Sequence, residues 1–379
     1  MKLLQINASY KPAYIYGGPT MSVSKLSEQM VQAGCNVKVY TTTANGNTEL
    51  PVSKNVPTNI DGADVIYFKR ITKDHSHFSP ALLKRLWKDA KDYDLIHIHA
   101  WWNLVSVLSC FIALIKGVPV LVSPRGTLSS YSFGNKNILQ KKLIHNLFGK
   151  YLLNRSYIHV TSPREKEGLI DIIAPKAFFD IPNFIEFPAN AFPGKQERYD
   201  TLKLLFFSRI EEKKGLDILL NALVNVIAPY TLTIAGDGNP GYIATLKLLA
   251  DHHQLSEKIS WIGFQGDNKF ELMQQHDLLV LPSYDENFGN VVIESLSMGT
   301  AVLISRFVGL ADYVEENDIG WISEHNAVSF ADAINLVGRQ KTKLANIRNT
   351  APARIRKDFD DEQLASGYIH MYKQIIDNS

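Results

Sequence analysis

The chain has 379 residues, more than one ordinary hydrophobic core accommodates, and this length predicts two domains of about 150–200 residues each. With 45% hydrophobic and 21% charged residues it has the composition of a globular protein. Its two cysteines exclude a disulfide framework and a four-cysteine zinc site, and we expect Cys35 and Cys110 to be buried free thiols.

The net charge of +2 conceals an asymmetry between the two halves of the chain. Residues 1–180 carry 22 Lys and Arg against 12 Asp and Glu, a net +10, and the remaining residues carry a net −8. Opposite signs predict two domains with different partners. A basic half suits phosphates, an anionic membrane surface or a nucleic acid.

The first half alternates short apolar runs with amphipathic segments, which is typical of parallel α/β domains. Met1–Tyr10 lacks the apolar run of a signal peptide, and the longest apolar stretch, Asn103–Ile115, is shorter than the about 20 residues of a membrane span. We therefore expect a buried helix there and a cytoplasmic protein. Another helix is expected over Thr20–Ala33, ended by Gly34. Strands are expected at Lys2–Ile6, Asn36–Thr41, Val65–Phe68, Leu95–Ile98, Val118–Ser123, Tyr157–Thr161 and Ala177–Ile181.

The periodicity stops after Ile181. Residues 187–200 hold two prolines, a glycine and mixed charges, and we interpret them as an interdomain linker. Alternation then resumes, with strands expected at Leu202–Phe207, Tyr230–Ile234, Ile259–Ile262, Leu278–Leu281, Ala301–Ile304 and Gly320–Ile322. The fold class is therefore α/β, with two Rossmann-like doubly wound domains, 1–186 and 201–361, and a ligand-binding cleft between them. A last helix, about 362–379, is expected to pack back on the first domain.

The densest functional signal is Ser283–Ala301, which follows an apolar strand and becomes a helix ended by Gly299. Glu286 lies in the loop before that helix and Glu294 on its first turns, so both can reach a ligand at the end of the strand. Carboxylates there can bind vicinal hydroxyls, and the helix N-terminus suits phosphate or sugar oxygens. Alternatively, the two glutamates only stabilise the helix N-terminus electrostatically.

A second signal is Phe206–Leu220, in which a strand is followed by Arg209, Lys213 and Lys214 and then by Gly215 at the start of a helix. Cations at this place indicate a diphosphate site. The alternative is a solvated cluster of charges paired with neighbouring glutamates. Two further turns follow strands, with the sequences AGDGNPG at Ala235–Gly241 and WIGF at Trp261–Phe264.

The ordered set SRIEEKKG, AGDG, WIGF and ENFGNVVIE resembles the nucleotide-sugar domain of the retaining glycosyltransferases of family 4, which have the two-domain GT-B fold. The resemblance covers essentially the whole chain. It implies that Arg209 and Lys214 bind the donor diphosphate and that Glu294 holds the ribose hydroxyls. It also implies that Glu286 and the backbone of residues 288–290 lie against the donor sugar, and that the base sits near Phe264. The residues implied in the backbone contact are Phe288, Gly289 and Asn290.

The first half contains further residues that this resemblance concerns. Gly17 and Gly18 directly precede a helix, and the family has a glycine loop there that contacts the donor phosphates. His97 and His99 end a strand and face the same side; alone they read as core histidines, but the resemblance implies that His99 contacts the donor sugar and that His97 is structural. Where many relatives have His-Gly, this chain has Arg125-Gly126, for which we expect an acceptor contact.

No cofactor and no metal ion are expected to be required. Asp92-Tyr93-Asp94 matches the D-x-D metal motif of the other main glycosyltransferase fold, but it precedes a strand and so should lie at the opposite edge of the sheet. The cations of the donor site are expected to replace a metal. The implied catalytic residues are Glu286, His99, Arg209 and Lys214.

Residues 126–164 contain six basic and no acidic residues, interleaved with apolar ones. Such a segment, particularly 136–155, either lies on an anionic membrane surface or is a packed helix with a basic solvent face. A lipid-linked acceptor would make peripheral contact with the inner face of the membrane reasonable.

We therefore expect a retaining glycosyltransferase in cell-surface polysaccharide biosynthesis. The donor would be a nucleoside diphosphate sugar, with a UDP-sugar favoured over a GDP-sugar, and the acceptor a saccharide or lipid-linked saccharide; no nucleic-acid partner is expected. Two alternatives remain: a sugar-nucleotide epimerase or synthase on the same fold, and a non-enzymatic protein that binds membranes or nucleic acid. The second leaves Glu286, Glu294, Arg209 and Lys214 without a role.

Overall fold

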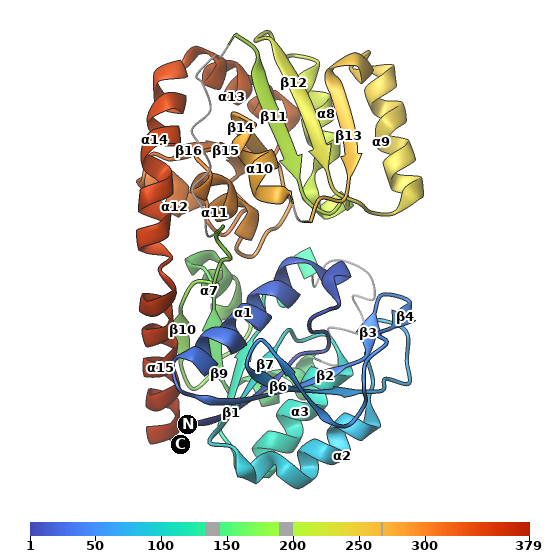
Figure 1. Cartoon of the computed structure of the whole chain (residues 1–379), viewed down its shortest axis with the longest axis vertical. Helices are drawn as coiled ribbons and strands as arrows, with labels where there is room; N and C mark the ends of the chain where they lie inside the picture. Colours follow the sequence, from blue (N-terminus) through green and yellow to red (C-terminus); the bar gives the residue numbers. More distant parts are fainter. Residues whose placement is uncertain (130, 133–144, 189–199, 267) are drawn as a thin grey trace. The chain divides into compact units, whose positions relative to one another are not determined.

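The computed structural model describes residues 1–129, 131–132, 145–188, 200–266 and 268–379. The chain divides into two compact units: unit 1 comprises Met1–Phe184 and Asp360–Ser379, and unit 2 comprises Ile185–Phe359. The C-terminal segment thus belongs to the same unit as the N-terminus (Figure 1). Most of the segment 187–200, interpreted as a linker, and residues 136–144 of the basic segment lie outside the described residues.

Unit 1 is built on an eight-stranded sheet of order β10-β9-β8-β7-β1-β2-β6-β5, parallel throughout except for the edge strand β5, which is antiparallel to β6. A separate hairpin pairs β3 with β4. The strands are β1 (Lys2–Ile6), β2 (Asn36–Thr42), β3 (Ala44–Asn45), β4 (Thr48–Glu49), β5 (Pro57–Ile60), β6 (Ala63–Phe68), β7 (Leu95–His99), β8 (Val120–Ser123), β9 (Tyr157–Val160) and β10 (Phe178–Asp180).

Helices cover both faces of this sheet and form two apolar cores with it. Buried residues of α1 and α15 share one core with strand residues such as Leu3 and Val39. Residues of α2, α3, α6 and α7 share the other core with strand residues such as Leu4 and Ile98. The helices are α1 (Gly18–Gln32), α2 (Pro80–Asp89), α3 (Leu104–Ile115), α6 (Lys150–Leu153), α7 (Pro163–Ile170) and α15 (Asp361–Asp377), with short η1 (Tyr14–Tyr16), η2 (Ala90–Asp92) and the π-turn η3 (His145–Gly149).

Unit 2 has a six-stranded, wholly parallel sheet of order β13-β12-β11-β14-β15-β16. The strands β14 and β15 are buried along their whole length, as expected of a parallel sheet covered on both faces, whereas the edge strand β13 is mostly exposed (Figure 1). The strands are β11 (Leu202–Phe207), β12 (Tyr230–Ala235), β13 (Ile259–Gly263), β14 (Leu278–Leu281), β15 (Ala301–Ser305) and β16 (Gly320–Ser323). The helices are η4 (Glu212–Lys214), α8 (Leu216–Leu223), α9 (Pro240–His252), η5 (Ser256–Lys258), α10 (Lys269–Gln274), α11 (Asn290–Ser297), α12 (Ala311–Glu316), α13 (Ala327–Arg339) and α14 (Lys341–Asp358).

Both sheets are doubly wound, as predicted, and each has a point where the strand order reverses. In unit 1 the chain leaves β1 toward β2 and later returns to β7 on the other side of β1. In unit 2 it leaves β11 toward β12 and returns to β14 on the other side of β11. Ligands of such sheets bind at the carboxyl ends of the strands beside this reversal. The loops after β1 and β7, and those after β11 and β14, are therefore where each unit is expected to bind ligands.

The predicted strands agree with the structure to within two residues at each end, and the differences have local causes. Helix α1 begins at Gly18 rather than Thr20, because Pro19 fits the first helical turn, where its missing N–H is not needed. Strand β8 begins at Val120 rather than Val118, because the Val118 N–H closes α3 by donating to the Ala113 carbonyl. The short strands β3, β4 and β5 were not predicted, since two to four partly exposed residues show no usable period.

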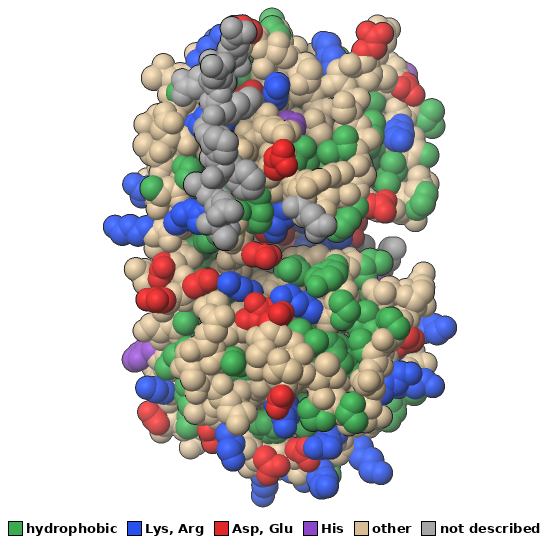
Figure 2. All heavy atoms as spheres, viewed as in Figure 1, with side chains coloured by type: hydrophobic (Ala, Val, Ile, Leu, Met, Phe, Trp, Pro, Cys, Tyr) green, Lys and Arg blue, Asp and Glu red, His purple; other side chains and the backbone are tan. Residues whose placement is uncertain are grey.

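The surface mixes charges of both signs. Figure 2 shows that Lys and Arg side chains on the visible face alternate with Asp and Glu and do not merge into one continuous basic patch. Cys35 and Cys110 are buried free thiols, as predicted. Among the described helices, none is both long and apolar enough to cross a bilayer.

Candidate functional site

In unit 2, the loop after β11 and the loop after β14 are joined by ion pairs. The Lys214 ammonium binds the Glu286 carboxylate, and both side chains are largely buried. Beside them Lys213 Nζ lies 2.8 Å from Asp285 Oδ2. Arg209 instead pairs with its neighbour Glu211 at 2.7 Å, where both side chains are nearly half exposed. The structure therefore brings the predicted Lys214 and Glu286 together, while Arg209 shows the internal pairing that the alternative interpretation expected.

Glycines set how closely these loops approach. Gly215 follows Lys214 with a φ of 69°, and a Cβ added to it would lie 2.0 Å from the Pro282 carbonyl oxygen. A Cβ on Gly236 would lie 1.8 Å from the Ser208 carbonyl oxygen, and one on Gly238 2.0 Å from that of Ile210. Only glycine fits such contacts without a backbone shift. The glycines of KKG and AGDG thus pack the strand-end loops against each other.

Backbone hydrogen bonds fix the loop that carries Glu286. The Glu286 N–H donates to the Phe307 carbonyl at 3.0 Å, and the Glu286 carbonyl accepts from the Gly309 N–H at 2.8 Å. Gly289 caps α11 in the left-handed conformation with a φ of 94°. Phe288 is buried in the apolar core, so only its backbone can face a ligand, while Asn290 begins α11. That residues 288–290 contact a ligand through their backbone stays a prediction.

Glu294 lies on α11 one turn beyond Asn290. Its Oε1 lies 3.1 Å from Lys269 Nζ at the start of α10, and both side chains are mostly buried. Phe264 follows β13 and its side chain is 70% exposed, an unusual position for a phenyl ring. Gly263, directly before it, has a φ of 69° with nothing within 4 Å of an added Cβ. Phe264 is therefore presented by a turn rather than packed into the core.

In unit 1, Gly17 caps α1 with a φ of 65°, and Gly18 is the first residue of that helix. The first N–H groups of a helix can bind an anion where they have no other partner. Here Pro19 has no N–H, the Gly17 N–H donates to the Tyr14 carbonyl at 2.9 Å and the Thr20 N–H to the Gly17 carbonyl at 3.1 Å, so Gly18 offers the N–H for such a contact. Tyr16, just before, accepts from the Gly46 N–H at 3.0 Å at the tip of the β3–β4 hairpin. The loop that leads to the two glycines is thus supported by the hairpin.

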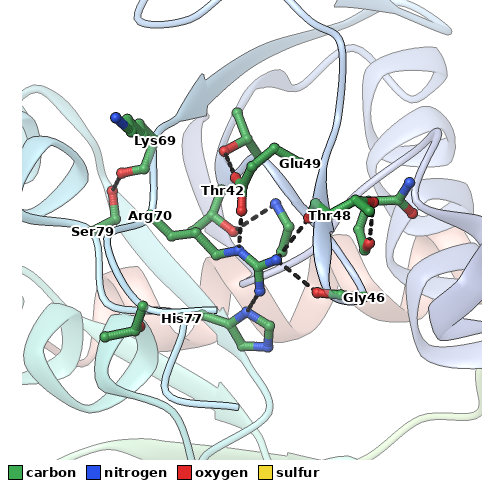
Figure 3. A network of polar contacts seen from close by, with 12 residues as sticks. Thr42, Gly46, Thr48, Glu49, Lys69, Arg70, His77 and Ser79 are labelled. Atoms are coloured by element: carbon green, nitrogen blue, oxygen red, sulfur yellow. Dashed lines mark hydrogen bonds and ion pairs between the residues drawn. The ribbon is translucent and has the colours of Figure 1, made fainter. Parts of the chain in front are cut away.

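The hairpin is itself held by a buried arginine. Figure 3 shows the Arg70 guanidinium pointing between the hairpin and the segment that carries His77. Its Nη2 donates to the carbonyls of Gly46 and Thr48 at 2.7 and 2.8 Å, its Nε binds Glu49 at 2.7 Å, and its Nη1 lies 3.2 Å from His77 Nδ1. Burial, followed by the nearby Arg70 charge, lowers the pKa of His77 to about 4, so that ring is neutral and accepts from the guanidinium.

His97 and His99 lie on the same side of β7, as predicted, with ring centroids 4.1 Å apart and both rings buried. His97 bonds Ser123 Oγ at 2.7 Å and the Tyr372 hydroxyl of α15 at 2.9 Å. Ser123 Oγ also lies 2.7 Å from His159 Nδ1. Burial lowers the pKa of His97 and of His99 well below the usual range, and lowers that of His159 to about 3.

One carbonyl determines which group donates in each hydrogen bond of this network. His159 Nε2 lies 2.9 Å from the Ile181 carbonyl oxygen, which can only accept, so Nε2 carries the proton of this neutral ring. His159 Nδ1 then accepts the Ser123 hydroxyl proton. Ser123 Oγ accepts in turn from His97 Nε2, which leaves His97 Nδ1 to accept from the Tyr372 hydroxyl. The predicted structural role of His97 thus has a specific form: it anchors α15 to the sheet.

Arg125 and Gly126, predicted to contact an acceptor, already have partners inside unit 1. Arg125 Nη1 donates to Asn183 Oδ1 at 2.8 Å and to Ser22 Oγ at 2.9 Å, and its Nε donates to His99 Nδ1 at 3.3 Å. The Gly126 N–H donates to Glu165 Oε1 at 2.8 Å. An acceptor contact remains a prediction, and the geometry favours a role in holding neighbouring groups.

Asp94 lies at the amino end of the sheet, where its carboxylate accepts from the Lys2 N–H at 2.8 Å. His99 ends the same strand that Asp94 precedes, so the D-x-D sequence and the histidines lie at opposite edges, as predicted. Within the part of the chain that the structure describes, no three His, Cys, Asp or Glu residues gather as metal ligands would.

Four residues near these groups were not anticipated: Lys269, Arg70, Glu165 and Tyr372. Glu165 had a readable signal, because Ser162–Glu165 has the S-x-x-E pattern of a helix N-terminus; the Ser162 hydroxyl accepts from the Glu165 N–H, while the Glu165 carboxylate accepts from the N–H groups of Thr161 and Gly126. The other three act across sequence separations of 21 to 275 residues, with no local motif to reveal the contact.

Chemically, unit 2 offers ammonium groups beside carboxylates at the end of the strands that flank its reversal point. A diphosphate would compete with the carboxylates for the lysines, and the released carboxylates would be free to accept from hydroxyl groups. Unit 1 offers a neutral histidine and the N-terminus of α1 at the corresponding end of its own sheet. Unit 2 thus offers groups suited to a phosphorylated, hydroxyl-rich ligand, and unit 1 separately offers hydrogen-bonding groups at its own strand ends.

Comparisons with known proteins cover almost the whole chain. The family described as Glycosyltransferase Family 4 matches residues 16–187, and that described as Glycosyl transferases group 1 matches residues 189–354. An uncharacterized glycosyltransferase of Methanocaldococcus jannaschii is 25% identical over 98% of each chain.

Two solved structures are similar over their full lengths. A sucrose-phosphate synthase from Thermosynechococcus elongatus has a TM-score of 0.78 at 19% identity, covering 100% of both chains. The Anabaena protein HepE, in complex with UDP-glucose, has a TM-score of 0.76 at 20% identity, covering 99% of this chain and 100% of its own. These likenesses confirm the predicted GT-B fold class.

Proposed function

The chain belongs to the glycosyltransferases of family 4, and from this premise we propose that it transfers a sugar from a nucleoside diphosphate sugar to a saccharide or lipid-linked saccharide, with retention at the anomeric carbon. A UDP-sugar is the favoured donor, because the similar HepE structure was obtained in complex with UDP-glucose. The observation that carries the proposal is the Lys214–Glu286 pair at the reversal point of the unit 2 sheet.

In this proposal the donor replaces the ion pairs of the free protein. The diphosphate takes Lys214 and Arg209, and the released Glu286 accepts from hydroxyls of the sugar. Glu294 holds the ribose hydroxyls, and the base lies near Phe264. As the bond to the leaving diphosphate breaks, negative charge grows on its oxygen, where the cations stabilise it; fixed cations near such a charge typically contribute about 10²–10³-fold in rate.

In unit 1, the proposed contributions are the backbone at Gly17 and Gly18 to the phosphates and His99 to the donor sugar. No side chain is proposed as a covalent nucleophile; the leaving phosphate would help to take the acceptor proton, as is thought for relatives of this family. Because the cations are proposed to replace a metal ion, EDTA is expected to leave the activity unchanged. Loss of activity that Mg²⁺ or Mn²⁺ restores would contradict this part.

Polysaccharide synthesis at the inner face of the cytoplasmic membrane is the proposed setting. It rests on the basic segment 136–155. The described part of this segment contains Lys150 and Arg155, and the exposed Tyr151 ring lies 3.7 Å from the Arg155 guanidinium. Co-sedimentation with vesicles rich in anionic lipid, compared with zwitterionic vesicles, tests it: equal binding to both would contradict the membrane role.

The activity itself is tested by ligand-induced stabilisation followed by turnover. UDP, GDP, UDP-glucose and GDP-mannose are titrated against the wild-type protein and Lys214→Ala, and we expect UDP compounds to raise the unfolding temperature of the wild type only. Mass spectrometry and NMR of products then identify the linkage and its anomeric configuration. Absence of binding by all four nucleotides, or epimerisation of the donor without an acceptor, would overturn the proposal.

A further inference from the structure

The hydrogen bond from Arg125 to His99 has a chemical consequence for the histidine. A guanidinium can only donate, so the 3.3 Å contact from Arg125 Nε makes His99 Nδ1 an acceptor without a proton. Burial, then the nearby His97 and the Arg125 charge, lowers the pKa of His99 well below its usual range. The ring is therefore neutral, and its single proton is on Nε2.

The Nε2–H of His99 is buried and, among the described residues, has no hydrogen-bond partner. A buried polar group left unpaired is destabilising, so native proteins rarely keep one without a reason. An oxygen of a bound ligand supplies that reason, because it can accept from Nε2–H. A ring with the opposite tautomer would present an acceptor there instead.

Arg125 is itself held in place by separate elements. Its Nη1 donates to Ser22 of α1 and to Asn183, which follows β10, while its backbone lies in the left-handed region with a φ of 52°. A non-glycine residue in that region is strained, and such strain is typically kept where the side-chain direction matters. The strained turn after β8 thus directs the guanidinium toward His99.

A second neighbour also fixes the orientation of the His99 ring. The His97 ring lies 4.1 Å away and is held by Ser123 and by Tyr372 of α15. His99 is therefore oriented by a neighbour whose own tautomer is set, and its proton is placed by Arg125.

We propose that Arg125 is a positioning residue which fixes His99 as the neutral Nε2–H tautomer, so that His99 donates a hydrogen bond to an oxygen of the donor sugar. The sugar contact rests on the proposed function, whereas the tautomer does not. Arg125 then acts on catalysis through His99 and not by touching the acceptor.

The first test needs no substrate. Long-range ¹H–¹⁵N correlation spectra of the ¹⁵N-labelled protein distinguish Nε2–H from Nδ1–H histidines, and His99→Gln assigns the signal. We expect wild-type His99 to be the Nε2–H tautomer at neutral pH. A Nδ1–H ring, a mixture of tautomers or a charged ring would overturn the proposal whatever the donor is.

Variants locate the cause. Arg125→Met has a side chain of similar shape without a donor, and it should shift His99 to a mixture of tautomers; Arg125→Lys, which keeps a donor, should shift it less. Methionine and lysine would each have the same backbone strain at this position as arginine. Ser22→Ala removes one bond to Arg125 and should leave His99 unchanged, and Tyr372→Phe should alter the His97 signal but not the His99 tautomer. An unchanged His99 signal in Arg125→Met would overturn the proposal, and the wild-type spectrum decides if that variant does not fold.

A double-mutant cycle tests the catalytic part with UDP-glucose as donor and its slow hydrolysis as the readout, so that no acceptor is needed. Arg125→Met should lower kcat/KM by roughly 10-fold or more in the wild-type background, in line with loss of one hydrogen bond to a reacting sugar, and by less than about 3-fold in the His99→Ala background. Equal losses in both backgrounds would show that Arg125 acts independently of His99. If the wild type does not turn over UDP-glucose, the donor assignment fails while the tautomer result stands.

Discussion

The two units present polar groups at the carboxyl ends of their sheets by opposite means. Unit 2 uses full charges: Lys213, Lys214 and Lys269 each pair with a carboxylate on another loop or helix, and the paired side chains are mostly buried. Unit 1 uses buried neutral rings: His97 and His159 are linked through Ser123, His99 accepts from Arg125, and the direction of each of these hydrogen bonds is set.

This difference has an energetic meaning. A lysine that leaves its carboxylate for a phosphate exchanges one charge-assisted partner for another, and the released carboxylate can accept from hydroxyl groups of the ligand, so no buried charge is left unpaired. A buried hydrogen-bonded network cannot rearrange in this way, since each broken bond leaves an unpaired buried group that costs about 1–3 kcal/mol. The charged region is therefore suited to exchange partners with a ligand, and the neutral region to hold one geometry.

The largest expected effect is at Lys214. Lys214→Ala should lower kcat by roughly 100-fold or more, because it removes a cation from the leaving diphosphate, while the unfolding temperature stays near that of the wild type. Lys343→Ala is the matched control, since it also loses an ion pair of unit 2, with Asp318, on the surface. Steady-state kinetics of both variants decide; wild-type turnover by Lys214→Ala would falsify the diphosphate assignment.

A smaller effect is expected at Glu294. Glu294→Gln keeps the shape of the side chain but loses the charge that strengthens its bonds to hydroxyls, and the KM for the donor should rise roughly 10-fold with kcat less affected. Comparison of UDP with 2′-deoxy-UDP by calorimetry sharpens the result. If Glu294 holds the ribose, the wild type should prefer UDP and the variant should lose most of that preference; an unchanged preference would place the ribose elsewhere.

Substitutions at two glycines of unit 2 distinguish the effect of backbone strain on stability from the effect of close packing. Gly215 and Gly263 have the same φ of 69°, but only at Gly215 would a Cβ meet the Pro282 carbonyl. Replacing either glycine by alanine should lower the free energy of unfolding by about 1–2 kcal/mol, because the left-handed backbone is strained with a Cβ. Gly215→Ala should lower it by about 1–3 kcal/mol more, because of the clash. Urea unfolding measures both, and Gly215→Ala, which displaces Lys214, should also lower donor affinity. Equal losses would mean that the loop adjusts freely.

The smallest effect concerns pH and unit 1. His159 has a pKa of about 3 when folded and about 6.5 when unfolded, so between these values the unfolded state binds the proton and the folded state does not. Stability contributed by the neutral ring is therefore complete above pH 6.5 and falls as the pH drops toward 3, by about 1 kcal/mol at pH 6.

His159→Gln cannot take up this proton, so its stability should fall less between pH 7.5 and pH 6 than that of the wild type. Urea unfolding of both proteins at the two pH values checks this. Parallel losses in the two proteins would mean that His159 is not held neutral by the fold.

Local patterns determined much of this protein. The alternation of apolar runs and amphipathic helices predicts the strands, because a strand buried on both faces must be apolar along its length. The sequence also predicts which residues lie at the carboxyl ends of the strands, among them Glu286, Lys214, Gly17 and His99, since parallel strands bring these ends to one edge. That edge is the part of the site that a sequence can indicate.

Partners across the fold were decided only by the tertiary structure. Nothing in the sequence near Glu294 indicates Lys269, and nothing near His97 indicates Tyr372, which is 275 residues away. The acceptor contact expected of Arg125 rests on its place where many relatives have His-Gly, and it stays a prediction; the hydrogen bonds that the structure shows go to α1, to Asn183 and to His99. The physical reason is that periodicity and turn residues encode local backbone geometry, whereas a side-chain hydrogen bond depends on which distant elements pack together, and only the assembled sheets and helices fix that.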